Sequence, residues 1–256
     1  MMIMKKLSVI IAAATLLLSQ HVSAQSEDKN IFNHMGAGIS LGTDGLGLDL
    51  SAPLTDMFAV RAGISWMPSI KVGANVDYNY NPDDFIKDNV DVTGKVNKFD
   101  FKLLFDYYPI KTSTFHITAG AFIGGDKVFE VTNDEQFIRK EKWGIAGVTI
   151  GDYFITSDKN GDIKADVKVA KFKPYIGLGF GRAIPNESLN LSCDFGVQFW
   201  GKPEVWSYAN NFGNFEYRKI EKGSGTGDKD GDKAFDILSK IIGYPVLNIR
   251  LTGRLF

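Results

Sequence analysis

The sequence KFDFKLLFDYY, from Lys98 to Tyr108, separates apolar from charged side chains more cleanly than any other segment of the chain. Every second position is large and apolar, and the positions between them carry mostly charge. These are Phe99, Phe101, Leu103, Phe105 and Tyr107 in one phase, and Lys98, Asp100, Lys102 and Asp106 in the other. Because successive side chains of a strand point to opposite faces of a sheet, this period of two predicts a β-strand with one apolar and one charged face.

The same alternation recurs in seven further segments, so the sequence predicts eight strands in all. The apolar phase is filled by Leu, Ile, Val, Phe and Ala, and the other phase is rich in glycine and polar residues. The seven segments are 36–42, 46–51, 58–66, 115–124, 175–181, 189–199 and 247–255.

Alternation alone fits two barrels, one soluble with its apolar face inside and one with that face toward lipid. Glycine crowds the polar face, which suits the tight interior of a small barrel. Trp66, Tyr107, Trp200 and Tyr244 stand near predicted strand ends, where a membrane barrel carries its aromatic girdles. Both observations favour the membrane barrel.

The connections between the predicted strands alternate in length. The even-numbered ones (53–56, 109–114 and 184–187) are short, and the odd-numbered ones, apart from the first turn at 43–45, are long (68–96, 129–171 and 201–243). Outer-membrane barrels have short periplasmic turns and longer outward loops. The sequence therefore predicts an all-β fold, an eight-stranded antiparallel up-and-down transmembrane β-barrel with three long outward loops and both termini in the periplasm.

The amino terminus predicts secretion. Lys5 and Lys6 precede an apolar run at 7–18, and Val22, Ser23 and Ala24 form a small-residue cleavage site. We expect a signal peptide over 1–24 and the barrel domain over 25–256. Cleavage would remove the two lysines and change the formal net charge from −1 to −3, which gives no electrostatic footprint for nucleic acid.

The polar phase of the predicted strands contains acids and bases together. In a closed barrel they would meet inside, where an unpaired charge costs several kcal/mol. The predicted lumen charge network consists of Asp49, Arg61, Lys98, Asp100, Lys102, Asp106, Lys173, Asp194, Arg250 and Arg254. Paired charges of this kind argue against a wide water-filled pore, and leave a narrow path or a filled, structural interior.

Several short motifs resemble those of the small outer-membrane β-barrels of the OmpA, OmpX and OmpW type, with the nearest likeness to barrels common in the Gram-negative Bacteroidetes. The motifs are LGTDGLG at 41–47, DYYP at 106–109, YIGLGFG at 175–181 and the closing segment 244–256. The resemblance implies location in the outer membrane, contact with its lipid and lipopolysaccharide, and insertion by the barrel assembly machinery. Such proteins include adhesins, narrow channels, structural tethers and a few lipid-modifying enzymes.

Two acidic turns resemble fragments of calcium loops. Asp228, Asp230, Asp232 and Asp236 place carboxylates at intervals that could wrap a hard cation, although Lys233 replaces the glycine that an EF-hand needs for its turn. The segment 158–162 with Asp166 is a similar fragment. A solvated acidic turn is the simpler reading of both, and no other cofactor is expected.

From Asp232 onward the apolar spacing becomes helical. Phe235, Leu238, Ile241 and Ile242 share one stripe, and Gly243 with Pro245 ends it. This spacing predicts a short helix before the last strand.

Catalytic patterns are scarce. Cys193 has no histidine near it in sequence, and His34 and His116 belong to no His-x-Ser arrangement.

Aromatic and amide residues in the long connections, at 78–81 and 206–212, suit adaptable surface contacts. We therefore expect a non-enzymatic barrel that has a structural or surface-recognition role, with an unidentified surface ligand. A narrow channel for small or apolar solutes and a lipid-modifying enzyme are the alternatives.

Overall fold

The computed structural model describes residues 34–77, 89–133, 138, 140, 143, 146–150, 153–185, 188–211, 214–220 and 242–255. The expected signal peptide lies outside these residues, as does the predicted helix except for Ile242. No helix among the described residues is long and apolar enough to span a bilayer.

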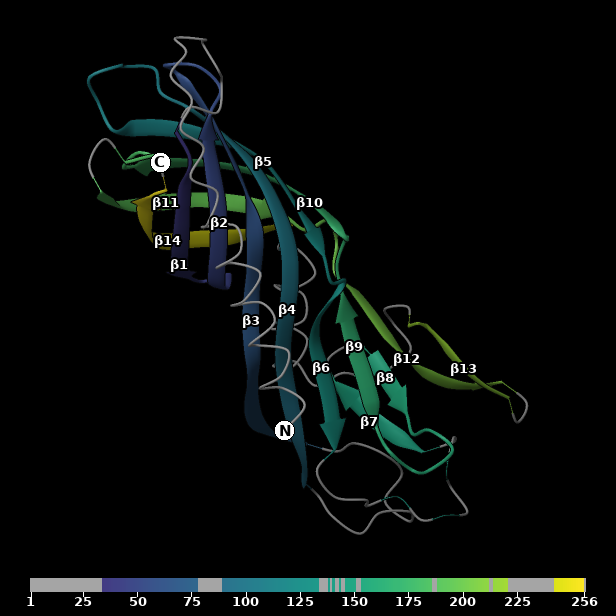
Figure 1. Ribbon diagram of the computed structural model, residues 1–256. Coiled ribbons are helices and arrows are strands. Elements are labelled where there is room, and N and C mark those ends of the chain that lie inside the picture. Colours follow the sequence, from purple (N-terminus) through teal and green to yellow (C-terminus); the bar gives the residue numbers. More distant parts are fainter. Residues whose placement is uncertain are drawn as a thin grey trace.

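Eight antiparallel strands close into a barrel, as predicted (Figure 1). They are β1 (Gly36–Gly42), β2 (Gly45–Pro53), β3 (Phe58–Asp77), β4 (Asn89–Tyr107), β5 (Phe115–Gly124), β10 (Phe172–Phe180), β11 (Leu189–Phe199) and β14 (Gly243–Arg254). Each pairs with the next in this order, and β1 pairs with β14 from Gly36–Arg254 to Gly42–Asn248, which closes the ring. The barrel part of the sheet therefore has no free edge.

The barrel is apolar on the outside and polar on the inside. All eight strands contribute exposed large hydrophobic side chains, which we call the apolar belt. Its members are Ile39, Leu41, Leu46, Leu48, Leu50, Phe58, Trp66, Phe99, Phe101, Leu103, Phe105, Ile123, Phe172, Ile176, Leu178, Phe180, Leu189, Leu191, Phe195, Phe199, Leu247, Ile249 and Leu251. A soluble monomer rarely exposes a contiguous apolar surface of more than a few hundred Å².

The two described chain ends lie together at one end of the barrel, where the Leu255 amide donates to the Met35 carbonyl oxygen at 2.8 Å. The connections at this end are short (54–57, 108–114 and 181–188), as the sequence predicted. The opposite end carries the tight β1–β2 turn. Gly45 has a φ of 99° there, and a Cβ at Gly45 would lie 2.4 Å from the Trp66 carbonyl oxygen.

The long connections differ from the prediction, because much of their length is strand rather than loop. β3 and β4 run on past the barrel, so most of the predicted long connection at 68–96 is a hairpin stem. β6 (Lys127–Asn133), β9 (Lys164–Lys168), β12 (Glu204–Asn211) and β13 (Asn214–Lys219) continue the sheet from the free edge of β4. The pairing of β4 with β5 ends at Asp100–Gly124, and from Val96 toward the start of β4 the strand pairs with β6 instead. An unpaired β4 edge would expose backbone hydrogen-bonding groups, and β6 satisfies them.

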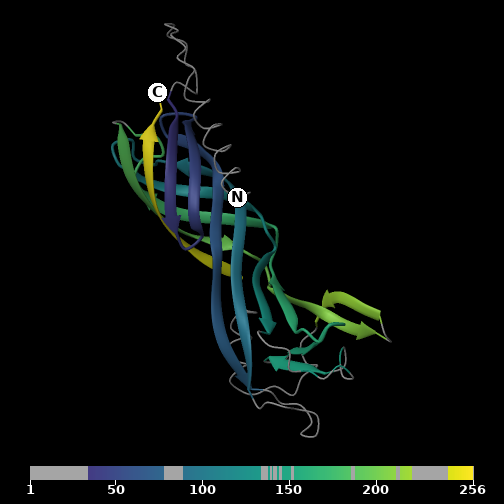
Figure 2. The same cartoon turned by 60° about the horizontal axis from the view of Figure 1, so that its bottom comes forward.

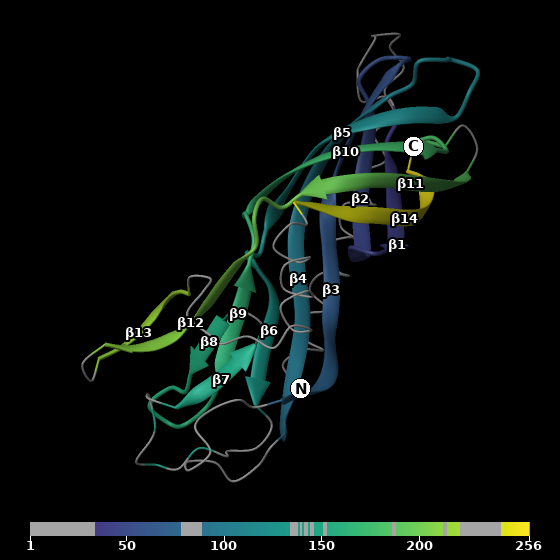
Figure 3. The ribbon, with the colours of Figure 1, turned by 180° about the vertical axis from the view of Figure 1, so that it is seen from behind.

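These added strands form an extension at the end of the barrel opposite the described chain ends, His34 and Leu255 (Figures 1, 2 and 3). One face of the extension is covered by β7 (Gly147–Ile150) and β8 (Tyr153–Thr156). Between the layers lies a small core made of Val131, Ile138, Ala146, Ile155, Ile163, Ala165 and Val205, with Phe129, Trp143 and Ile220 at its margin. The extension is therefore folded around its own core.

Candidate functional site

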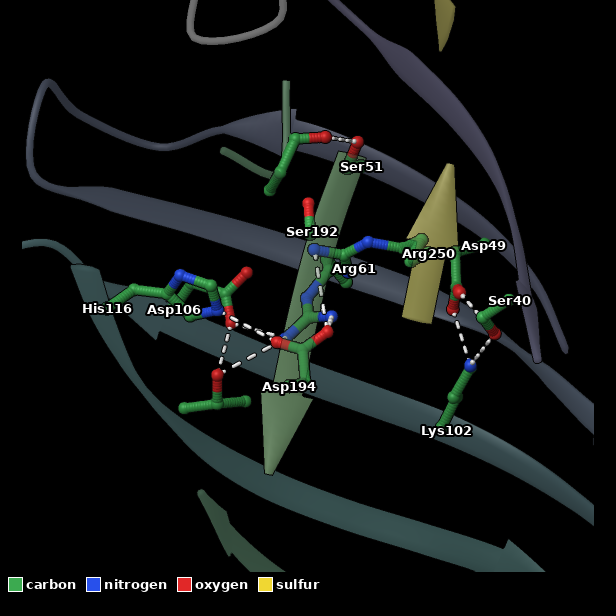
Figure 4. A network of polar contacts seen from close by, with 12 residues as sticks. Ser40, Asp49, Ser51, Arg61, Lys102, Asp106, His116, Ser192, Asp194 and Arg250 are labelled. Carbon is green, nitrogen blue, oxygen red and sulfur yellow. Dashed lines mark hydrogen bonds and ion pairs between the residues drawn. The ribbon is translucent and has the colours of Figure 1, made fainter. Parts of the chain in front are cut away.

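The centre of the barrel interior is crossed by Arg61 (Figure 4). Its guanidinium reaches Asp106 of β4 at 2.7 Å and Asp194 of β11 at 3.1 Å. Thr118 of β5 also accepts a hydrogen bond from Arg61 at 3.2 Å and donates to Asp106 at 2.7 Å. Since Arg61 is 4% exposed and Asp106 0% exposed, this cluster ties strands β3, β4, β5 and β11 together inside the barrel.

Asp194 also contacts two other basic side chains. His116 Nε2 lies 2.8 Å from Asp194 Oδ1, and the nearest guanidinium nitrogen of Arg250 lies 3.7 Å from Asp194 Oδ2. His116 was not among the predicted network residues, although it lies on the polar phase of its strand. Its imidazole is fully buried, in contrast to the exposed ring of His34.

Two further ion clusters lie on the side of the interior nearer the extension. Lys102 contacts Asp49 at 3.0 Å. Asp100 lies between two lysines, with Lys173 at 2.7 Å and Lys98 at 3.1 Å. Nine of the ten predicted network residues are thus buried inside the barrel and contact an opposite charge.

Arg254 is the exception to this burial, so its predicted place inside the lumen is wrong. Its position on β14 has the interior phase, but the strand ends at this residue and its side chain is exposed. Its guanidinium lies 2.9 Å from His34 Nδ1, at the rim beside the chain ends. Periodicity gave the correct face of the strand, but could not show that the barrel had already ended.

The interior is filled rather than open. The cavity between Asp49, Arg61, Lys102, Asp194 and Arg250 has a volume of about 10 Å³. A single water molecule needs roughly 10–15 Å³ of such volume. Arg250 is 2% exposed, and among the described residues its guanidinium has no hydrogen-bond partner beyond the 3.7 Å contact with Asp194.

Two aromatic residues close the interior at the extension end. The rings of Trp200 and Tyr244 stack with centroids 4.4 Å apart, and the Lys98 ammonium lies 5.3 Å and 5.1 Å from their centroids. The Tyr244 hydroxyl donates to the Thr43 carbonyl oxygen at 2.5 Å. Their assignment to a lipid-facing girdle is therefore wrong, because both lie on the interior phase; Trp66, at 47% exposed, does face outward.

The outward face changes character along β4. From Tyr107 back to Phe99 it is apolar, and the next outward positions are Asn97 and Lys95. The five outward residues from 99 to 107 span about 26 Å along the strand, or about 20 Å along the barrel axis at a tilt of ~40°. That height is close to the ~25 Å apolar band of outer-membrane barrels.

Beyond this change the outward face of the extension carries a charged and aromatic cluster. Asp166 of β9 is fully buried there and contacts Lys127 at 2.6 Å, and the Tyr217 hydroxyl donates to the same carboxylate. The Asp166 hydrogen bond raises the pKa of Lys127, while burial and the hydrogen bond to Asp166 raise the pKa of Tyr217. The Lys168 ammonium lies 4.2 Å and 4.5 Å from the ring centroids of Trp206 and Tyr217.

The main calcium candidates, Asp228, Asp230, Asp232 and Asp236, lie outside the described residues. In the similar turn at 158–162, Asp158 Oδ1 accepts from the amides of Asn160 at 2.7 Å and Asp162 at 3.0 Å. Asp166 binds Lys127 instead of joining this turn. In the part of the chain that the structure describes, no group of three or more His, Cys, Asp or Glu side chains is placed to hold a metal ion.

Comparison with known proteins gives distant structural similarity only. No family model matches the sequence, and no curated protein gives a significant match. Among solved structures, CarO2 of Acinetobacter baumannii has a TM-score of 0.48 at 17% identity, over 88% of this chain and 100% of that chain. CarO of the same organism has a TM-score of 0.46 at 15% identity, over 88% and 99% of the two chains. At these values the likeness assigns neither a family nor a function.

Proposed function

We propose that the protein is a non-enzymatic outer-membrane barrel that anchors a folded recognition module, the extension, at the cell surface. The main support for this proposal is the apolar belt. It is formed by outward side chains of all eight strands, and on β4 it ends at Asn97, where the outward face becomes polar. Lipid acyl chains would cover such a belt. The eight strands and the short turns beside the chain ends support assignment to the OmpA, OmpX and OmpW type of Bacteroidetes barrel.

In this proposal the chain ends face the periplasm and the extension faces outward. A signal peptide over 1–24 would direct export of the barrel domain at 25–256, and the barrel assembly machinery would insert it. Lipid and lipopolysaccharide would surround the barrel, and the surface ligand would bind the extension. The presence of Trp206 and Tyr208 on strand β12 supports this role, since rigid aromatic groups make efficient contact surfaces.

Orientation can be tested by labelling single cysteines in intact cells. We expect Lys159→Cys, in the exposed turn between β8 and β9, to react with a membrane-impermeant maleimide, and Lys111→Cys at the opposite end to react only after the outer membrane is permeabilised. Both are made in a Cys193→Ala background, since Cys193 is the only cysteine. The reverse labelling pattern would place the extension in the periplasm and overturn the proposed surface role.

The alternative function, a narrow channel, predicts ion flow through the barrel. The ~10 Å³ interior cavity and the Arg61 contacts to Asp106 and Asp194 favour a closed barrel. We expect the purified protein to leave planar-bilayer conductance unchanged after insertion is verified in the same preparation. Steady unit conductance steps would instead support the channel. A change in lipid A mass when the protein is expressed would support the third candidate, a lipid-modifying enzyme.

A further inference from the structure

Lysines stand opposite one another on the outward face of the extension, just past the apolar belt. Lys71 of β3 pairs directly with Lys95 of β4, and Lys127 of β6 pairs directly with Lys168 of β9. We call these four the junction lysines. Like charges directly opposite on one face of a sheet are destabilising, so two such pairs side by side call for a compensating anion.

The nearby carboxylates compensate only part of this charge. Asp166 contacts Lys127 at 2.6 Å, and Glu130, the cross-strand neighbour of Lys95, contacts Lys164 at 3.5 Å. Glu204, the cross-strand neighbour of Lys168, contacts Lys219 at 2.7 Å. Among the described residues, no carboxylate oxygen lies within 4.0 Å of the ammonium groups of Lys71, Lys95 or Lys168. The outward face here therefore keeps excess positive charge.

The junction lysines lie at the level of lipid headgroups. Lys95 is four positions from Phe99 on the same strand, β4, where that strand enters the apolar belt. Lys168 is the last residue of β9, and three residues outside any strand separate it from Phe172, the first residue of β10. Four strand residues rise about 13 Å, or about 10 Å along the barrel axis at a tilt of ~40°. Each headgroup region is about 5–8 Å thick beyond the hydrocarbon, so long lysine side chains reach into it.

The surface also has room for a headgroup. Where β4 leaves β5 and joins β6, a pocket of about 110 Å³ is lined by Lys95, Asn97, Lys127 and Glu130, with Val128 and Phe129. Beside it, the Trp206 and Tyr217 rings hold the Lys168 ammonium. Lysine with Trp and Tyr is the combination that membrane proteins place at the lipid–water interface.

We propose that the junction lysines bind the phosphate-bearing headgroups of lipids in the leaflet that meets the extension. This inference rests on the proposed membrane insertion. The bound lipid would offset the like-charge pairs and hold the extension close to the membrane surface.

The test counts bound lipids by native mass spectrometry on full-length protein released from mixed micelles. Phosphatidic acid and phosphatidylcholine are supplied in equal amounts, with and without excess inorganic phosphate. We expect wild-type protein to retain phosphatidic acid preferentially, and free phosphate not to displace it. In the triple variant Lys71→Gln, Lys95→Gln, Lys168→Gln, the preference for phosphatidic acid should fall by more than about tenfold. Each lysine near a membrane surface contributes roughly a factor of five to the affinity for anionic lipid. Lys127 is left in place because it neutralises buried Asp166.

A matched variant, Lys111→Gln, Lys140→Gln, Lys159→Gln, removes the same charge away from the junction and should keep the wild-type preference. Equal loss in both variants would overturn the proposal, as would displacement by free phosphate or the absence of any preference in wild-type protein. Insertion into phosphatidylcholine vesicles is measured for all three proteins. Failure to insert would instead refute the membrane barrel itself.

Discussion

Replacing Leu103 by lysine is expected to destabilise the folded protein in lipid vesicles by about 2–4 kcal/mol, the cost of a lysine near the bilayer midplane on a barrel's lipid face. Leu103 is the middle residue of the five apolar outward positions on β4 and is 46% exposed. If water surrounded the barrel, an exposed leucine could become lysine with little effect or with a gain in solubility. The substitution therefore distinguishes lipid from water at this surface.

The control is Asn97→Lys on the same strand and the same outward face, past the end of the apolar belt. It should change stability by at most about 1 kcal/mol, as expected near the membrane interface. Urea unfolding from phosphatidylcholine vesicles, followed by tryptophan fluorescence, measures both variants. If the two substitutions had equal small effects, the outer surface would not face lipid.

Replacing Arg61 by alanine is expected to cost about 3–5 kcal/mol, because it leaves two buried carboxylates without their shared cation. Arg61 bridges Asp106 and Asp194 across the filled interior. Urea unfolding in the same vesicles measures this loss. The matched control is Lys111→Ala, which breaks the exposed pair with Asp56 at 3.3 Å and should cost no more than about 1 kcal/mol.

A rescue variant separates charge from lost packing. Adding Asp106→Asn and Asp194→Asn to Arg61→Ala removes the unpaired negative charges, and this triple variant should recover part of the lost stability. Buried ion clusters can often be replaced by uncharged groups at little net cost. If the triple variant were no more stable than Arg61→Ala alone, the stability lost in Arg61→Ala would not come from unpaired buried carboxylates.

The barrel could be predicted from sequence because its signal is local. Each strand, such as 98–108, shows its own two faces without knowledge of its partner. The ion pairs could be predicted only as a set, since Arg61 and Asp194 are 133 positions apart and only barrel closure brings them together.

The extension was missed because its strands are short and their pairing is non-local. β9 has five residues, too few for a convincing alternation, and Trp206 and Tyr208 resemble loop contacts until β12 is seen paired with β9 and β13. The continuation of β3 and β4 beyond the belt was hidden for another reason. The outward positions change there from apolar to polar, so the pattern that marked the strand is lost although the strand continues.

The central claim, a closed barrel embedded in lipid, is tested most directly by electrophoresis of protein extracted from membranes, with and without boiling in SDS. A closed barrel resists unfolding by SDS, so the unboiled protein should run as a faster, compact band that shifts on boiling. A single unshifted band, with the protein recovered in the soluble periplasmic fraction, would contradict the claim.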